Sequence, residues 1–349
     1  MIDFIEQTAF ELGFDAVKIT NANDLEDANN HFLSWREKGY AADMNYLLRD
    51  NPINAKPKKI LPEATSIITL LINYYTKCPP DPGPDYGRIA SYAVGTDYHI
   101  ILKEKISIFQ ETLKKEFGEN VISKGFSDAV PFLEKSFAKE SGHGFTGKHT
   151  LLINKSIGSY FFICEIISNL DLKETKKEEG TCGQCTRCID ICPTKAIVSP
   201  YQLDARKCIS YLTIENKKGI DFSLRKQTGS WLFGCDDCQI ICPYNKYNLK
   251  ETTWKEFHPE AGTGHWIRLS DILSIKSDED FKQKFANTPL LRGKRKGLIR
   301  NACIVAGNRK SKEAYPYLEK LLNDKDTMVQ EHAQWAINQY HFNHFNISE

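Results

Sequence analysis

Residues 182–193 read CGQCTRCIDICP, and this short segment contains four cysteines. The first three stand three positions apart, and the fourth follows after four positions and directly precedes a proline. Three thiolates at this spacing can cap three corners of one [4Fe–4S] cubane, while the fourth turns away and can ligate a second cluster. The segment therefore predicts an iron–sulfur protein with two clusters.

A second run, from Cys235 to Pro243, repeats the spacing without its first cysteine, and Cys208 lies 27 residues earlier. Eight thiolates then serve two clusters with none left over, in the manner of bacterial ferredoxins. Cross-ligation assigns Cys182, Cys185, Cys188 and Cys242 to one cluster (the first cysteine set) and Cys192, Cys208, Cys235 and Cys238 to the other (the second cysteine set). Zinc is the alternative, although zinc ribbons prefer paired CxxC hooks.

Eleven cysteines are present in all, and the three outside these sets are isolated. Cys78, Cys164 and Cys303 are each most simply a small core residue. The N-terminal residues MIDFIEQTAF have acids and no basic region, so we expect neither a secretory nor a twin-arginine signal. The expected location is the cytoplasm, where structural disulfides are rare and clustered cysteines favour metal binding.

The overall composition is that of an ordinary globular protein. A chain of 349 residues predicts two or three domains. Its 46 basic and 45 acidic residues nearly cancel, so a nucleic-acid role must depend on a local patch. The longest apolar stretch, 67–75, is too short to cross a bilayer, and no membrane association is expected.

Residues 1–172 are expected to form an α+β domain. The predicted helices cover 2–12, 25–38, 106–117 and 131–141, the last beginning at Pro131, and the predicted strands cover 15–20, 66–75 and 121–126. A hairpin is predicted from 150–154 and 159–168. After a charged linker at 173–180, the cysteines define a ferredoxin-like domain over 173–250.

From about residue 265 the pattern is helical, and 265–349 is expected to form HEAT-like helical repeats. Apolar residues at helical spacing predict helix pairs over 289–307 and 315–340. Two repeats are fewer than a free-standing solenoid needs, so we expect them to pack on the rest of the protein.

Three N-terminal segments, 88–99, 128–135 and 142–150, are rich in functional groups. On physical grounds alone each of their residues has a simpler interpretation. Asp128 could cap a helix, and His99 could be a surface residue at a helix start. Glu134 and Lys135 fit a solvated helix face.

Together with the cysteine spacing, these segments resemble the epoxyqueuosine reductase family, and the similarity covers nearly the whole chain. The matching parts are DYH at 97–99, DxxPxxEK at 128–135, GFxGKxTLLIN at 144–154, LIRNA at 298–302 and AGN at 306–308. The family often has GxG(F/W)xGKNT in the third of these segments, and this chain has His143 and His149 there.

The resemblance implies a cobalamin enzyme that reduces epoxyqueuosine to queuosine at the wobble position of tRNA. Two [4Fe–4S] clusters, fed by an external low-potential electron donor, would bring the cobalt to its nucleophilic Co(I) state, and the epoxide oxygen would leave as water. The family's proton donor maps onto Asp128, whose carboxyl would need an apolar site to stay protonated. Ser91, Tyr98, His99 and Asp128 are implied to lie near the cobalamin, and the protein is expected to be a monomer.

A local charge asymmetry supports a tRNA substrate independently. The basic stretch, 281–312, contains ten lysines and arginines and no aspartate or glutamate. Basic helical repeats can follow a phosphate backbone, and a solvated helix face is the plainer alternative. The predicted tRNA-binding residues are Arg292, Lys294, Arg295, Lys296 and Arg300.

Two other functions fit part of this pattern. A reductive dehalogenase would share the cofactors, but such enzymes usually have a twin-arginine signal and do not need a basic stretch. A ferredoxin-like carrier fused to a binding module would bind no cobalamin and make no product.

Overall fold

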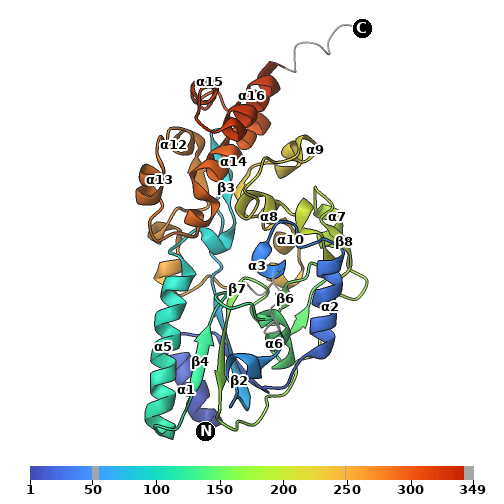
Figure 1. Ribbon diagram of the computed structural model, residues 1–349, viewed down its shortest axis with the longest axis vertical. Helices are drawn as coiled ribbons and strands as arrows, with labels where there is room; N and C mark the ends of the chain where they lie inside the picture. The colour runs from blue at the N-terminus through green and yellow to red at the C-terminus, as the bar shows by residue number, and fades with distance from the viewer. Residues whose placement is uncertain (49–54, 248, 342–349) are drawn as a thin grey trace.

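The computed structural model describes residues 1–48, 55–247 and 249–341, so each of the three predicted regions contains a few residues outside the description. The lower half of the molecule is built on a sheet, and the upper half is mostly helical (Figure 1). Among the described residues, no helix is long and apolar enough to cross a membrane.

A four-stranded sheet forms the centre of the lower half. Its strands, in spatial order, are β1 (Ala16–Asn21), β2 (Ser66–Asn73), β7 (Phe161–Ser168) and β4 (Ser123–Phe126), and all neighbours are antiparallel. These strands confirm the predictions for 15–20, 66–75 and 121–126 to within a few residues. Every residue of β2 is buried, because helices cover both faces of the sheet.

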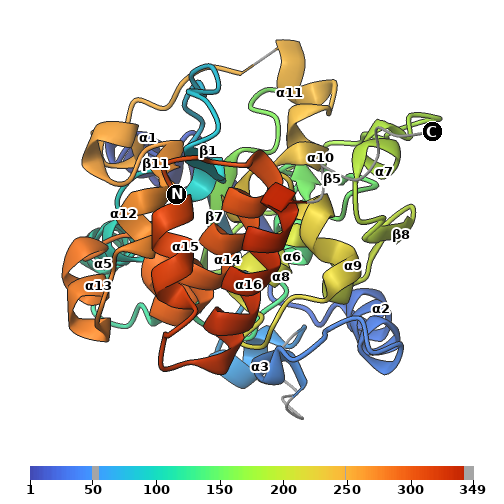
Figure 2. The ribbon, with the colours of Figure 1, turned by 90° about the horizontal axis from the view of Figure 1, so that it is seen from above.

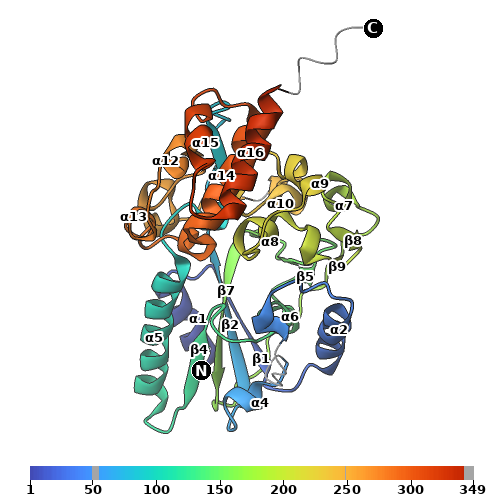
Figure 3. The ribbon, with the colours of Figure 1, turned by 45° about the horizontal axis from the view of Figure 1, so that its top comes forward.

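The helices on the two faces bury complementary apolar stripes. α1 (Ile2–Glu11) and α5 (Tyr98–Phe117) lie on one face, where Leu102 and Phe109 pack against Leu70. α6 (Glu134–Glu140) lies on the other face and contributes Phe137 and Ala138 to the core (Figure 3). The remaining helices of this half are α2 (Glu26–Glu37), α3 (Asn45–Leu48) and α4 (Pro57–Ile60).

Two local predictions in this half are wrong. The helix predicted to begin at Pro131 begins at Glu134, because the backbone is still turning at Phe132, whose N–H bonds the carbonyl of Val130. The predicted hairpin is reduced to a bridge between Asn154 and Gly158. β6 (Leu152–Ile153) pairs instead with β5 (Phe145–Thr146), and β7 enters the large sheet.

The cysteine-rich region is a series of short elements above the sheet (Figure 3). They are α7 (Arg187–Ile191), β8 (Ile197–Ser199), β9 (Gln202–Leu203), α8 (Ile209–Ile214), α9 (Phe222–Arg225), β10 (Trp231–Phe233), α10 (Asp237–Ile240) and α11 (Tyr244–Tyr247). α7 and α10 lie against each other, which brings the two cysteine runs together.

A second sheet joins the three predicted regions. β3 (Tyr86–Ile89) lies in the predicted region 1–172, β10 in the region 173–250, and β11 (Trp266–Arg268) in the region 265–349. β3 is the central strand, parallel to β10 and antiparallel to β11. The backbone therefore links all three regions by hydrogen bonds.

The C-terminal region is helical, as predicted. Its helices are α12 (Leu269–Leu273), α13 (Asp278–Lys284), α14 (Lys294–Arg309), α15 (Tyr315–Leu321) and α16 (Thr327–His341). α14, α15 and α16 lie side by side when seen from above (Figure 2). All residues of α14 from Gly297 to Gly307 are buried, and α14 also contacts α8 and β10. These helices thus pack on the rest of the protein, as expected.

The isolated cysteines differ in their surroundings. Cys164 and Cys303 are fully buried core residues, as predicted. Cys78 is only partly buried, so its prediction as a core residue is wrong. Cys78 lies in the proline-rich loop, outside the helices and strands that form the core.

Candidate functional site

The first cysteine set surrounds a small cavity. Cys182, Cys185, Cys188 and Cys242 line it together with His149, Arg187, Pro243 and Tyr244. Burial and the other three thiols raise the pKa of Cys188 to about 11, which reflects how closely the four sulfurs approach. The backbone N–H of Lys148 donates to the sulfur of Cys182 at 3.4 Å. The structure therefore brings together the four residues that the spacing assigned to one cluster.

The second cysteine set also converges. Burial raises the pKa of the Cys238 thiol, and the nearby Cys208 and Cys192 raise it further. Burial likewise raises the pKa of Cys235, with Cys238 among its neighbours. No three His, Cys, Asp or Glu side chains in the described ranges gather closely enough to hold one metal ion. The thiols are spread around a volume and do not meet at one point.

Ser91 connects the second cysteine set to the N-terminal half. Its backbone N–H donates to Oδ2 of Asp236 at 2.7 Å, and Asp236 stands between Cys235 and Cys238 in the sequence. Ser91 and Asp236 are both buried. The predicted cofactor residue Ser91 thus lies directly beside the predicted cluster ligands.

Asp128 occupies a constrained turn directly after β4. Its φ of 55° lies in the left-handed region, which is uncommon for a residue other than glycine. Its backbone N–H donates to Oε1 of Glu134 at 2.7 Å, and its Oδ2 accepts from the Tyr98 hydroxyl at 2.6 Å. Asp128 is therefore not a helix cap, since the residue preceding α6 is Leu133.

The Asp128 side chain is exposed, and the apolar enclosure expected from the sequence is not formed by the protein alone. One side of the carboxyl is nevertheless covered by the buried Tyr98. Burial raises the pKa of Tyr98 strongly, and the charge of Asp128 raises it further. The phenol therefore keeps its proton at neutral pH and remains a hydrogen-bond donor to Asp128.

A chain of aromatic rings leads from Tyr98 toward the second cysteine set. Tyr98 stacks on Phe162 with centroids 4.2 Å apart, and Phe162 contacts Tyr74 at 4.5 Å. Burial raises the pKa of Tyr74, and the nearby Asp236 and Cys238 raise it further. Asp128 and the second cysteine set therefore face the same aromatic layer.

His99 lies at the first turn of α5, as the sequence suggested. Its Nδ1 is 2.8 Å from Oδ1 of Asp97, which is the N-cap residue of α5. The His99 ring stacks on Tyr98 with centroids 4.1 Å apart, and the side chain remains 47% exposed. His99 thus supports Tyr98 and contacts Asp128 only through it.

Sequence reasoning missed one contribution to this site. Glu134, interpreted as part of a solvated face, is half-buried and holds the Asp128 backbone. Burial and the charge of Asp128 raise the pKa of Glu134 well above its ordinary value. Lys135 is exposed, as the solvated-face interpretation expected, and its Nζ donates to the carbonyl of Thr150 at 3.2 Å. The DxxPxxEK motif could have suggested Glu134, because the turn returns the chain toward Asp128.

The basic stretch is only partly a surface. Arg300 is fully buried and donates to the carbonyls of Leu212, Asn216 and Lys218, so its assignment to the tRNA surface is wrong. It lies on the inner side of α14, where it provides hydrogen-bond donors for backbone carbonyls of the cysteine-rich region.

The other predicted tRNA-binding residues differ in their exposure and in their ion pairs. Arg295 is 14% exposed and pairs with Asp324 at 2.9 Å. Arg292 forms a two-point pair with Glu215, at 2.7 and 3.2 Å. Lys296 is 53% exposed beside Asp326, and Lys294 is exposed. Lys294 and Lys296 are thus the residues of this set best placed to meet a phosphate.

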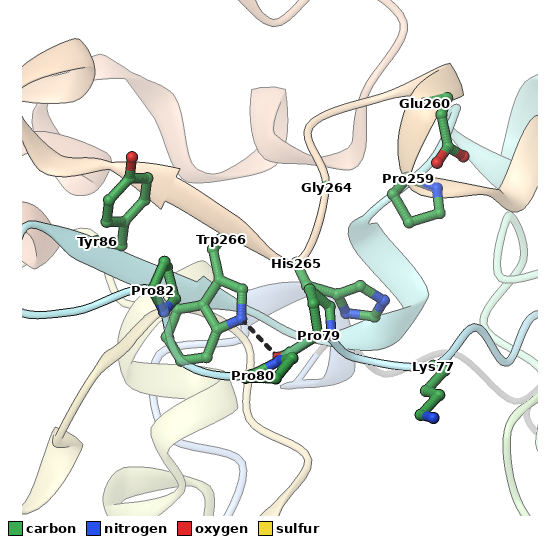
Figure 4. Close-up of a pocket in the computed structure, with 10 residues that line it drawn as sticks. All are labelled: Lys77, Pro79, Pro80, Pro82, Tyr86, Pro259, Glu260, Gly264, His265 and Trp266. Atoms are coloured by element: carbon green, nitrogen blue, oxygen red, sulfur yellow. Dashed lines mark hydrogen bonds between the residues drawn. The ribbon is translucent and has the colours of Figure 1, made fainter.

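A larger cavity of about 540 Å³ lies apart from these residues (Figure 4). The prolines at 79, 80 and 82 form part of its wall, with Trp266 and His265. Two of its polar side chains are bonded internally: Trp266 Nε1 donates to the Pro79 carbonyl at 3.2 Å, and His265 Nε2 lies 2.9 Å from Thr76 Oγ1. None of the predicted site residues lines it, so it is not the candidate site.

Two known protein families match the chain. The family described as "4Fe-4S double cluster binding domain" matches residues 181–245. The family described as "Epoxyqueuosine reductase QueG, DUF1730" matches residues 55–129. The fold and the converging cysteines thus define the class, an iron–sulfur protein with a double-cluster domain, and zinc is set aside.

Curated relatives identify the family within this class. A protein named epoxyqueuosine reductase from Leadbetterella byssophila is 38% identical over 86% of this chain and 97% of its own length. The epoxyqueuosine reductase of Escherichia coli is 34% identical, over 96% of this chain and 88% of its own. The chain belongs to the epoxyqueuosine reductase family of oxidoreductases.

Solved structures agree with this assignment. A crystal structure of epoxyqueuosine reductase with an epoxyqueuosine-modified tRNA-Tyr stem loop has a TM-score of 0.88 and 28% identity, and covers 97% of this chain and 89% of its own. The structure from Streptococcus thermophilus has the same TM-score at 27% identity, covering 97% of this chain and 90% of its own.

Proposed function

We propose that the protein reduces epoxyqueuosine in tRNA to queuosine, with Asp128 as proton donor, two [4Fe–4S] clusters as electron relay and cobalamin as the reacting cofactor. The observation that carries this proposal is the hydrogen bond of 2.6 Å between Tyr98 and Asp128, together with the aromatic rings of Tyr98, Phe162 and Tyr74 that lead toward the second cysteine set. An acid and an electron relay next to each other are what a reductive ring opening requires.

The cysteine sets fit two cubane clusters. The first set has four thiols around one cavity. In the second set, burial and neighbouring thiols raise the pKa values of Cys208, Cys235 and Cys238. Cys188 and Cys238 are close enough for each set to influence the other. We infer that electrons pass from an external low-potential donor through the first set to the second, which lies nearer to Asp128.

The residues around Asp128 fit a large cofactor that receives these electrons. The Asp128 carboxyl is exposed, and burial raises the pKa of Tyr92, with Asp236 and Asp128 as charged neighbours. Ser91, Tyr92 and Tyr98 would lie beside cobalamin, with His99 behind Tyr98. When bound, cobalamin would supply a strongly reducing cobalt nucleophile.

The protein's own contribution to the reaction is a positioned acid. The Tyr98 hydroxyl occupies Oδ2 of Asp128, so Oδ1 is the oxygen left to carry a proton to the substrate. An epoxide oxygen leaves poorly as an alkoxide, and protonation by a carboxylic acid lets it leave, finally as water. Bound cofactor and substrate would cover the exposed carboxyl, and this loss of water favours its protonated form.

A tRNA substrate is supported by the exposed part of the basic stretch and by the related structure with a modified stem loop. Lys294 and Lys296 would contact phosphates, with Arg292 beside them. A protein acting on tRNA is expected in the cytoplasm, and we expect it to act as a monomer.

Asp128→Asn tests the proposal. Asparagine keeps the hydrogen bond from Tyr98 but cannot donate a carboxylic proton. We expect turnover to fall by roughly a hundred- to ten-thousand-fold, the usual worth of general-acid catalysis. The measurement is the rate of queuosine formation in tRNA, with iron content and the cobalamin spectrum recorded alongside.

Asp97→Asn is the matched control. Asp97 is a nearby carboxylate that bonds His99 and has no role in the proposed proton transfer. It should lose little activity. If Asp128→Asn keeps more than about a third of wild-type turnover while chemistry limits the rate, Asp128 is not the acid.

A further inference from the structure

His149 lies at the first cysteine set, at a position where the chain departs from the family pattern. Its side chain is only 3% exposed and lines the same cavity as Cys182, Cys185, Cys188 and Cys242. Neither the proposed electron path nor the acid chemistry at Asp128 uses it.

The hydrogen bonds of His149 determine where its ring proton lies. The backbone N–H of Leu151 donates to Nδ1 at 3.2 Å, so Nδ1 has no proton of its own. In a neutral imidazole the proton is then on Nε2. Nε2 is buried and has no hydrogen-bond partner in the part of the chain that the structure describes. Leaving such a donor buried and unpaired is unfavourable, so a partner is expected.

The packing around the ring shows which edge is free. A Cβ atom added to Gly147 would lie 2.7 Å from Cε1 and 3.1 Å from Nδ1 of His149. The ring edge that carries Cε1 and Nδ1 therefore rests against Gly147 and Leu151. His149 lines the cavity of the first cysteine set, and the edge that carries Nε2 is the one that neither Gly147 nor Leu151 holds.

We propose that Nε2–H of His149 donates a hydrogen bond to a sulfur atom of the cluster held by the first cysteine set. This inference rests on the cluster assignment made above. Hydrogen bonds to cluster sulfurs stabilise the more negative reduced form and raise the reduction potential. His149 thus raises the reduction potential of the first cluster and makes this cluster easier to reduce.

His149→Phe tests this, because phenylalanine keeps an aromatic ring of similar size and removes the donor. The probe is an EPR-monitored redox titration of anaerobically reconstituted full-length protein without cobalamin. A net hydrogen bond of about 1 kcal/mol predicts that the ratio of reduced to oxidised first cluster at a fixed potential falls roughly fivefold. The second cluster in the same sample is the internal reference and should not change.

Two further variants separate the hydrogen bond from packing. His149→Gln retains an N–H donor and should recover most of the lost ratio. His143→Phe is the matched control, because His143 is equally buried but its Nε2 already bonds the carbonyl of Thr69 at 2.8 Å. Its redox titration should match that of wild type even if its stability falls.

The possible outcomes are distinct. An unchanged titration of His149→Phe with full iron content would overturn the inference. Iron falling toward half in that variant would also overturn it, because His149 would then be needed to hold the cluster. If the wild-type protein itself does not hold two clusters, the proposed function fails first, whatever the His149 variants show.

Discussion

The cysteine runs and the basic stretch behave differently, although both stand out equally in the sequence. The structure gathers the first cysteine set around one cavity and brings Cys192, Cys208 and Cys235 near Cys238. The basic stretch instead divides into buried Arg300, half-buried Arg295 and exposed Lys294. Ligand spacing constrains local geometry, because neighbouring thiolates must reach one cluster. A count of charges says nothing about the direction in which a helix turns each side chain.

The largest effect is expected at the first cysteine set, with Cys242→Ala. Wild-type protein reconstituted without oxygen should hold about eight iron and eight sulfide per chain, as two cubanes require. The variant should lose the first cluster, retain about four iron and make no queuosine. Iron and sulfide analysis measures this, and Cys303→Ala, at a buried cysteine outside both sets, is the control. About eight iron per chain in Cys242→Ala would show that Cys242 is not a ligand of the first cluster.

An intermediate effect is expected at Arg300, the buried member of the basic stretch. Arg300→Met leaves the carbonyls of Leu212, Asn216 and Lys218 without their donor, at about 1–3 kcal/mol each. Thermal unfolding should therefore show a loss of roughly 3 kcal/mol or more, while the folded protein binds tRNA as before. Lys294→Met is the exposed control. Weakened tRNA binding without a loss of stability would mean that Arg300 does contact tRNA, and the structural role proposed here would be wrong.

The smallest effect is expected at the exposed lysines. Lys294→Glu with Lys296→Glu should leave stability and iron content almost unchanged. Each lost phosphate contact lowers the slope of log K against log salt by about 0.7 to 0.9. Titrating tRNA at several salt concentrations measures this slope. Lys115→Glu, near the far end of α5, should not change it (Figure 1). An unchanged slope in the double variant would remove the basic stretch from substrate binding.

The fold was predictable where the residue periodicity within a single helix or strand is enough to identify that element. The buried strand β2 and the apolar stripe of α5 follow directly from residue periodicity. The pairing of β3 with β10 and β11 was not, because these strands are short and far apart in the sequence. The predicted hairpin failed for a related reason: Gly158 turns with a φ of 73° against Asn245, a contact from a distant segment.

The site was predictable to the same extent. Resemblance led to Asp128, and spacing led to the cysteines. The role of Glu134 depends on a turn that places it against the Asp128 backbone, which no helical pattern reveals. The buried state of Arg300 depends on carbonyls of the cysteine-rich region, and His149 became notable only when its Nε2 was found without a partner. Long-range contacts decide all three.

The sheet formed by β3, β10 and β11 has a consequence for the speed of electron delivery. β3 leads directly into Ser91, and β10 leads directly into Cys235, so backbone hydrogen bonds fix the separation between the two ends. Under the proposed function, an electron leaving a cluster held by the second cysteine set would therefore cross a constant gap, and no tethered domain would have to swing into place. The rate of this step should be insensitive to solvent viscosity. The rate at which the external electron donor binds should fall as viscosity increases.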